Sequence, residues 1–146
     1  MHQEHHGEEG HHKAARAAID ALFDAMRAAD GDAVRAVFAE NARLMSTGDR
    51  EGVPFIRETP IEAFAGAVDK AAVGSWDERI WDVMIQVDGN LAAAWVPYAF
   101  YHDGNLTHCG VNSVQIARME AGWKIVQLTD TRQSEGCEIP DDVTKK

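Results

Sequence analysis

The chain has 146 residues, a length that corresponds to one domain. Its composition, 45% hydrophobic and 26% charged, is typical of a folded globular protein and excludes a largely disordered chain. The net charge of −10 disfavours binding to nucleic acid or to an anionic membrane surface. Two cysteines cannot form a disulfide framework, and neither a membrane-spanning run nor a secretory signal is recognisable. The sequence therefore predicts a cytoplasmic protein.

The first twelve residues hold five of the seven histidines, together with acidic residues and glycines. No apolar neighbours hold these rings in place, so residues 1–12 are expected to form a disordered His-rich tail. Imidazole is a good ligand for transition metals, which leaves loose metal binding by this tail open as an alternative.

From Lys13 to Ala29 the apolar residues recur at steps of three and four, which predicts an amphipathic helix. Asp30 is placed to cap a second, shorter helix. A strand is expected over residues 42–46, ended by a turn at 47–49, and another strand over 53–57.

The segment Thr59-Pro60-Ile61-Glu62 has the pattern of a capping box, which predicts a third helix that ends before Gly74. Beyond Gly74 the apolar residues alternate, as in β-strands. Four successive strands joined by short turns are expected over residues 76–87, 91–102, 107–118 and 123–132. Helices followed by strands predict an α+β domain over residues 13–133. Its three helices, all in the N-terminal half, should pack on the concave face of a cone-shaped, curved antiparallel (mixed) sheet. Residues 134–146 are expected to form a C-terminal tail.

Two regions carry a family resemblance. The segment "IDALFDAMRAADGDAVRAVFAENARLMS" at residues 19–46 resembles the opening of the nuclear transport factor 2-like superfamily, which includes ketosteroid isomerase, scytalone dehydratase and SnoaL-like polyketide cyclases. The later segments "AWVPYAFYHDGNLTHCGVNSVQI" and "GWKIVQLTDTR" resemble its lumazine-binding-like group. The resemblance implies the cone fold but no single chemistry, because the superfamily contains enzymes, binding proteins and transport adaptors.

Tight hairpins would place Trp95 opposite Val114 and Val114 opposite Gln127, on one face of the sheet. Aligned with ketosteroid isomerase through "GWKIV", the oxyanion-hole aspartate falls on Val114, which implies that this face lines the pocket. The expected ligand-binding residues are Ser46, Trp95, Tyr101, His108, Asn112, Val114, Gln127 and Thr129. The opposite face would be an association surface for a homodimer, formed by Tyr98, Val111, Ser113, Leu128, Asp130 and Arg132.

The resemblance argues against the catalytic arrangement of ketosteroid isomerase, because its three catalytic positions fall on Ser46, Leu22 and Val114. His108 is the remaining candidate for a general base, with ligand contact or a structural hydrogen bond as alternatives. Glu78 and Asp82 are candidates for a carboxylate that works with it.

Buried amides need hydrogen-bond partners, so Asn112 and Gln127 either bond to the protein or meet a ligand. Trp95 could stack on a flat ring. Cys109 and Cys137 are either paired or two separate thiols.

These residues predict a homodimeric protein that binds a flat, moderately polar small molecule in an apolar pocket, without a cofactor or metal. Two alternatives stay open. One is an enzyme of the cyclase, isomerase or dehydratase kind that uses His108, and the other is an association module with a closed pocket.

Overall fold

The computed structural model describes the backbone of residues 2–145 and the side chains of residues 9–145. Its helices are α1 (His2–Arg27), α2 (Gly31–Val37), α3 (Ile61–Lys70) and α4 (Asp141–Thr144). Its strands are β1 (Phe38–Arg50), β2 (Val53–Thr59), β3 (Trp76–Ile80), β4 (Met84–Asp88), β5 (Leu91–His102), β6 (Asn105–Met119) and β7 (Gly122–Asp130). The strands form one sheet in the order β2-β1-β7-β6-β5-β3, with β4 also paired to β5. Only the β1–β7 pair of this described sheet is parallel.

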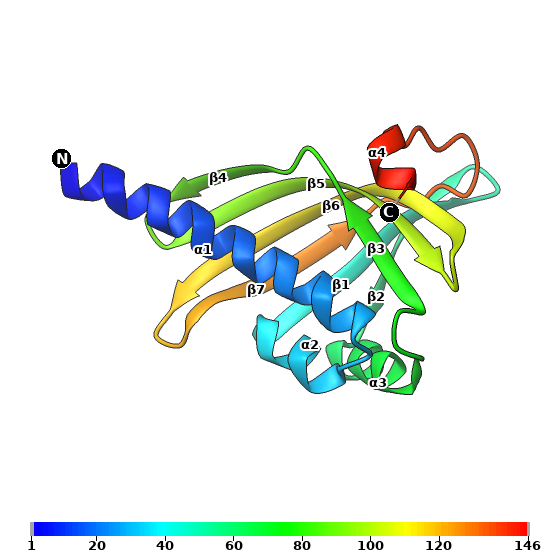
Figure 1. Ribbon diagram of the computed structural model, residues 1–146, viewed down its shortest axis with the longest axis horizontal. Helices are drawn as coiled ribbons and strands as arrows, with labels where there is room; N and C mark the ends of the chain where they lie inside the picture. Colours follow the sequence, from blue (N-terminus) through cyan, green and yellow to red (C-terminus); the bar gives the residue numbers. More distant parts are fainter. Residues whose placement is uncertain (1, 146) are drawn as a thin grey trace.

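Figure 1 shows α1 lying across one face of the curved sheet, with α2 and α3 together at the lower end. Helix α1 buries an apolar stripe at helical spacing against strands that present short aliphatic side chains. This core contains Ala15, Ile19, Leu22, Phe23 and Met26 from α1, and Ala92, Ala94, Val96, Val114, Ile116, Ile125 and Leu128 from the sheet. The predicted α+β class, with its curved mixed sheet and its helices in the N-terminal half, is confirmed.

Helix α1 begins at His2, well before the predicted start at Lys13. The segment expected to be a disordered tail therefore continues the helix in this structure. A contact at the far end of the sheet accompanies this extension, since the His11 ring lies 5.4 Å from that of Trp123. Metal binding by the tail stays a prediction, because the side chains of His2, His5 and His6 lie outside the described residues.

The local cap predictions had mixed outcomes. Asp30 caps α2 as expected, with its carboxylate accepting a hydrogen bond from the Ala33 N–H at 3.0 Å. The capping box at the start of α3 is wrong, because Thr59 is the last residue of β2 and pairs with Leu44. Pro60 occupies the cap instead and makes no side-chain cap hydrogen bond.

Two strand predictions are also wrong. The turn expected at residues 47–49 does not form, because β1 continues to Arg50 and the hairpin turns at Glu51 and Gly52, both with positive φ. The strand expected over residues 76–87 is divided into β3 and β4. The break includes Asp82, whose φ of 46° is incompatible with an extended strand.

Beyond β7 the chain crosses back over the sheet. A disulfide joins Cys137 to Cys109 on β6, and Val143 in α4 is 2% exposed. Among the helices that the structure describes, none is long and apolar enough to cross a membrane.

Candidate functional site

A cavity of about 530 Å³ opens between α3, β2, β3 and the hairpin end of β5 and β6. Its apolar lining comes from Met26, Ala63, Phe64, Ala67, Trp76 and Phe100, and its polar lining from Arg57, Thr59, Glu78, His102, Thr107, His108, Asp130 and Arg132. A volume of several hundred Å³ with a few converging polar groups is typical of a small-molecule site.

Aromatic rings form one wall of this cavity. Phe64 lies 6.1 Å from Trp76, and Trp76 lies 6.0 Å from Phe100, measured between ring centroids. The His108 ring stacks on Phe100 at 5.1 Å with an interplanar angle of 21°. This wall suits a flat apolar body.

Glu78 lies on β3, whose alternation directs its side chain to the core side of the sheet, where it is 8% exposed. The Asn112 side-chain N–H donates to Oε2 of Glu78 at 2.8 Å. Burial raises the pKa of Glu78 to about 7, reinforced by the nearby charge of Asp130 and opposed by the Asn112 hydrogen bond. The cavity therefore contains a carboxyl group that exchanges its proton near neutral pH.

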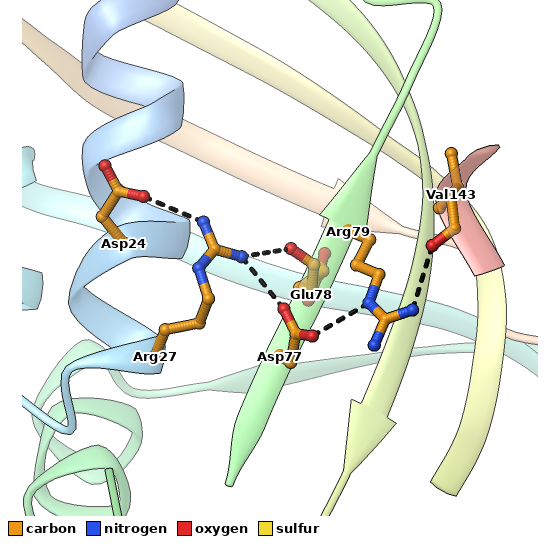
Figure 2. Close-up of polar contacts among 6 residues, drawn as sticks. All are labelled: Asp24, Arg27, Asp77, Glu78, Arg79 and Val143. Atoms are coloured by element: carbon orange, nitrogen blue, oxygen red, sulfur yellow. Dashed lines mark hydrogen bonds and ion pairs between the residues drawn. The ribbon is translucent and has the colours of Figure 1, made fainter. Parts of the chain in front are cut away.

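The strand that carries Glu78 is an edge strand held by arginines. Figure 2 shows Arg27 of α1 between Asp24, Asp77 and the backbone of Glu78, whose carbonyl accepts from Nη1 at 2.8 Å. This carbonyl would otherwise be unpaired on the free edge of β3. Through Arg27, helix α1 thereby holds the backbone of β3 in place at Glu78.

Asp130, the last residue of β7, provides a second buried carboxyl group. Nε of Arg132 donates to its Oδ2 at 3.3 Å, while Oδ1 is buried without a partner of good hydrogen-bond geometry among the described residues. Burial raises the pKa of Asp130, opposed by the Arg132 charge and by the Ser46 hydroxyl on the neighbouring strand. A buried acceptor without a partner at a cavity wall can receive a hydrogen bond from a ligand.

The hydrogen bonds of Tyr98 determine the tautomer of His108. The Tyr98 hydroxyl donates its one proton to the Thr131 carbonyl at 2.7 Å, and it also lies 2.9 Å from Nδ1 of His108. Nδ1 must therefore carry the proton and donate to the hydroxyl oxygen, which leaves Nε2 as an acceptor. Burial, helped by the charge of Arg132, lowers the pKa of His108 to about 4. His108 is consequently a neutral acceptor at physiological pH.

The predicted register between β5 and β6 is wrong by two residues at the hairpin, where Tyr101 pairs with Leu106, and by one residue beyond the bulge. Trp95 pairs with Ser113, and Ala94 pairs with Val114, because a bulge lies between Phe100 and Tyr101. A second bulge shifts β6 against β7 between Gln115 and Ile116. A shift of one residue moves a side chain to the other face of the sheet, which explains the errors in the face assignment.

Of the expected ligand-binding residues, only His108 lines the cavity beside α3. Asn112 reaches it indirectly by holding Glu78, Ser46 lies beside Asp130, and Val114 is buried in the core. Four residues lie on the outer face, which corrects their prediction. Trp95 is 55% exposed there, Tyr101 is covered by the C-terminal segment, and Gln127 donates to Thr129 at 3.3 Å.

The expected dimer face is corrected for the same reason. Tyr98, Leu128 and Asp130 are buried on the core side, and Arg132 lines the cavity. Ser113 lies on the outer face beside Trp95, and Val111 is half-buried.

Sequence reasoning left Glu78 as an unplaced candidate and placed Asp130 and Arg132 outside the pocket. The alternation of "WDERI" contained a usable signal, because Trp76, Glu78 and Ile80 share one face of their strand. Among the described side chains, no three His, Cys, Asp or Glu residues come together as metal ligands.

Comparisons with solved structures find the same fold. A nuclear transport factor 2-like protein with a cystatin-like fold from Novosphingobium aromaticivorans has a TM-score of 0.72 at 14% identity, over 92% of this chain and 90% of that chain. A nuclear transport factor 2-like protein of unknown function from Shewanella baltica has a TM-score of 0.66 at 16% identity, over 84% and 93%. A protein of the same family from Streptomyces avermitilis, proposed to be a dehydratase, has a TM-score of 0.60 at 13% identity, over 83% and 94%.

At these identities the likeness concerns the fold alone. A comparison with curated protein sequences finds no match. The sequence profile of the SnoaL-like domain matches residues 15–129, which is most of the chain. The chain belongs to the family of SnoaL-like domains, within the nuclear transport factor 2-like fold.

Proposed function

We propose that this protein is an acid–base enzyme of the isomerase, dehydratase or cyclase kind, in which Glu78 transfers a proton to and from a small, largely apolar substrate. The observation that carries the proposal is the position of the Glu78 carboxyl group: it lines the cavity, is 8% exposed and accepts from Asn112, and burial raises its pKa to about 7. A general acid–base group works best when its pKa lies near the operating pH. A purely passive pocket gains nothing from a buried ionisable group, which costs stability.

The other polar groups fit supporting roles. Arg132 donates one hydrogen bond from Nε to Asp130. Its other N–H groups can stabilise negative charge that develops on a substrate oxygen. Nε2 of His108 can accept a hydrogen bond from a substrate hydroxyl or N–H group. With a pKa of about 4, His108 is too weakly basic to compete with Glu78 for a proton.

Proton exchange between solvent and an enolisable carbonyl compound tests this proposal directly. Aromatic ketones such as tetralones are incubated with the protein in D₂O, and deuterium incorporation is followed by NMR. The wild type should accelerate exchange, and Glu78→Gln should lose about 100-fold or more of the acceleration. Glu120→Gln, in the exposed β6–β7 turn, is the matched control and should behave as wild type.

The second candidate function is binding without reaction. The aromatic wall and the neutral acceptor on His108 support it, since both would hold a flat, moderately polar ligand. Flavin precursors, pterins and aromatic polyketides are suitable probes in a thermal-shift screen. Equal stabilisation of wild type and Glu78→Gln by a probe, with no deuterium exchange in any ketone tested, would favour binding over catalysis.

We also propose a homodimer, with a second copy covering the exposed part of the outer sheet face. Trp95, Met84 and Leu91 are 55%, 65% and 51% exposed on this side, and Met84 pairs directly with Trp95. Sizing in solution should give a dimer, and Trp95→Lys should give a monomer. A monomeric wild type at micromolar concentration would contradict this proposal.

The predicted cytoplasmic location stays a prediction. The Cys109–Cys137 disulfide argues against it, because reducing conditions in the cytosol disfavour such bonds.

A further inference from the structure

The C-terminal segment, residues 133–145, is fastened to the sheet at two places. The first is on β6, where the backbone groups of Cys109 and Gln133 exchange hydrogen bonds of 2.9 and 2.8 Å and the disulfide joins Cys109 to Cys137. Cys137 and Ile139 pack there against Ala99 and Tyr101 of β5.

The second attachment is on β3, next to Glu78. The Arg79 guanidinium donates to the Val143 carbonyl at 3.0 Å and to the Asp77 carboxylate at 2.9 Å, as Figure 2 shows. The same group lies 3.8 Å over the Tyr101 ring. Arg79 thus connects the C-terminal segment, β3 and β5 through a largely buried side chain, 12% exposed.

These contacts matter because β3 has few other supports. It has five residues and pairs with β5 alone. The chain breaks from the sheet at Asp82, one residue after the Trp81 N–H donates to the Pro97 carbonyl at 3.3 Å. Short edge strands with one neighbour open locally at lower free energy than the centre of a sheet. Arg27 holds this edge from α1, and Arg79 holds it from the C-terminal segment.

We propose that Arg79 is a positioning residue for Glu78, and that the Cys109–Cys137 disulfide controls this positioning by keeping the C-terminal segment in place. This inference rests on the proposed function only for its catalytic consequence. The switch is a thiol–disulfide exchange with a dithiol reductant. The S–S bond breaks, each sulfur gains one electron and one proton, and the reductant is oxidised to its own disulfide.

Reduction would leave the C-terminal segment attached only by non-covalent contacts. Cys137 is less buried than Cys109 and is the sulfur that a reductant can reach. Once the segment separates, Arg79 loses Val143 as a partner. Strand β3 then keeps its ladder with β5, the Arg27 contacts, the Asn112 hydrogen bond to Glu78 and the core packing of Trp76 and Ile80, but it has lost the support on its outer side. Water then reaches Glu78, which removes the cause of its raised pKa.

The experiment compares the full chain in its oxidised form, after treatment with dithiothreitol, and as Cys137→Ser. Two readouts need no substrate: amide hydrogen exchange, and the titration midpoint of the Glu78 carboxyl group by ¹³C NMR. Reduction and Cys137→Ser should each accelerate exchange of the β3 amides at least tenfold and leave the central β6–β7 amides unchanged. Both should move the Glu78 midpoint from about 7 towards the usual 4.5.

Arg79→Met keeps the disulfide and an unbranched apolar stem but removes the guanidinium, and it tests the proposal even if loss of the disulfide unfolds the whole protein. It should give the same two changes, and Arg43→Met, which breaks an exposed pair with Glu58, should give neither. Unchanged β3 exchange and an unchanged Glu78 midpoint in Arg79→Met would overturn the proposal. Loss of activity is read separately, so an inactive wild type would contradict the proposed function without affecting this test.

Discussion

Two titrating groups line the cavity, each held by a neighbour behind it: Glu78 by Asn112 and His108 by Tyr98. Burial shifts their pKa values in opposite directions. It disfavours the charged form of each titrating group, so it raises the pKa of the carboxyl group to about 7 and lowers that of the imidazole to about 4. The acid becomes able to exchange protons near neutral pH, whereas the base stays neutral. The histidine, which is the more familiar candidate for acid–base chemistry, is therefore the less suited of the two here.

The largest expected effect concerns this division of roles. Glu78→Gln keeps an oxygen that accepts from Asn112 but removes the titrating group, so catalysed exchange should fall about 100-fold or more. His108→Gln removes only a hydrogen-bonding group and should reduce the rate about tenfold or less, as for loss of one neutral hydrogen bond. The deuterium-exchange rates of the two variants, each compared with that of the wild type, measure the difference between the two roles. A larger loss in His108→Gln than in Glu78→Gln would reverse the assignment.

The second prediction concerns the pH dependence of stability. The folded pKa of Glu78 lies above its usual 4.5, so its contribution is complete below pH 4.5 and is lost as the pH rises through 7. The size is roughly 3 kcal/mol for a fully buried group. The folded pKa of His108 lies below its usual 6.5, so its contribution is present above pH 6.5 and is lost as the pH falls through 4. That amount is about 1–2 kcal/mol, because His108 is only partly buried and solvent screens its charge.

The two contributions oppose each other between pH 4.5 and 6.5, and single variants separate them. Across this range the unfolding free energy of Glu78→Gln should rise more steeply with pH than that of wild type, and that of His108→Gln should fall. Urea denaturation at several pH values measures these free energies. Asp130 is present in both variants, so its own contribution to the pH dependence of stability cancels when they are compared. Parallel profiles for the two variants would show that neither pKa is displaced.

The third prediction concerns the support of the imidazole. Tyr98→Phe leaves the Thr131 carbonyl and Nδ1 of His108 without their shared partner, at a cost of about 1–3 kcal/mol. The ring should then no longer be held in the tautomer with the proton on Nδ1, which ¹⁵N NMR of the imidazole distinguishes. An unchanged single tautomer in Tyr98→Phe would mean that another group fixes the ring.

The smallest expected effect concerns the amide beside the carboxyl group. Asn112 donates to Glu78 and favours its charged form, so Asn112→Ala should raise the pKa of Glu78 above 7. The activity-against-pH profile should move to higher pH in the same direction. A downward shift would indicate that water enters the space left by the amide.

The sequence predicted most of the elements and much less of the site. Strand β5 was predicted at its observed bounds, because its alternation and its flanking turns are local features. Which side chains point to the core side of the sheet depends on bulges at Phe100/Tyr101 and at Gln115/Ile116. No local sequence pattern predicts these bulges. The bulge at Phe100/Tyr101 moved Trp95 from the expected pocket to the surface, and the bulge at Gln115/Ile116 brought Asp130 inside.

The environment of Glu78 depends on contacts that are distant in the chain. Asn112 lies 34 residues away, and Arg27 reaches the same strand from α1. Sequence patterns indicate that Glu78 faces the same side as Trp76, but they do not give its burial or its charge neighbours. The pairing of Cys109 with Cys137 was likewise left open, because the return of the chain after β7 decides it.

One titration tests the central claim most directly: the ¹³C chemical shift of the Glu78 side-chain carboxyl group, followed from pH 3 to pH 9 in the oxidised protein and assigned through Glu78→Gln. A midpoint near pH 7 is the expected result. A midpoint near 4.5 would mean that the carboxylate is solvated like a surface residue, and an enzyme built on this group would be excluded.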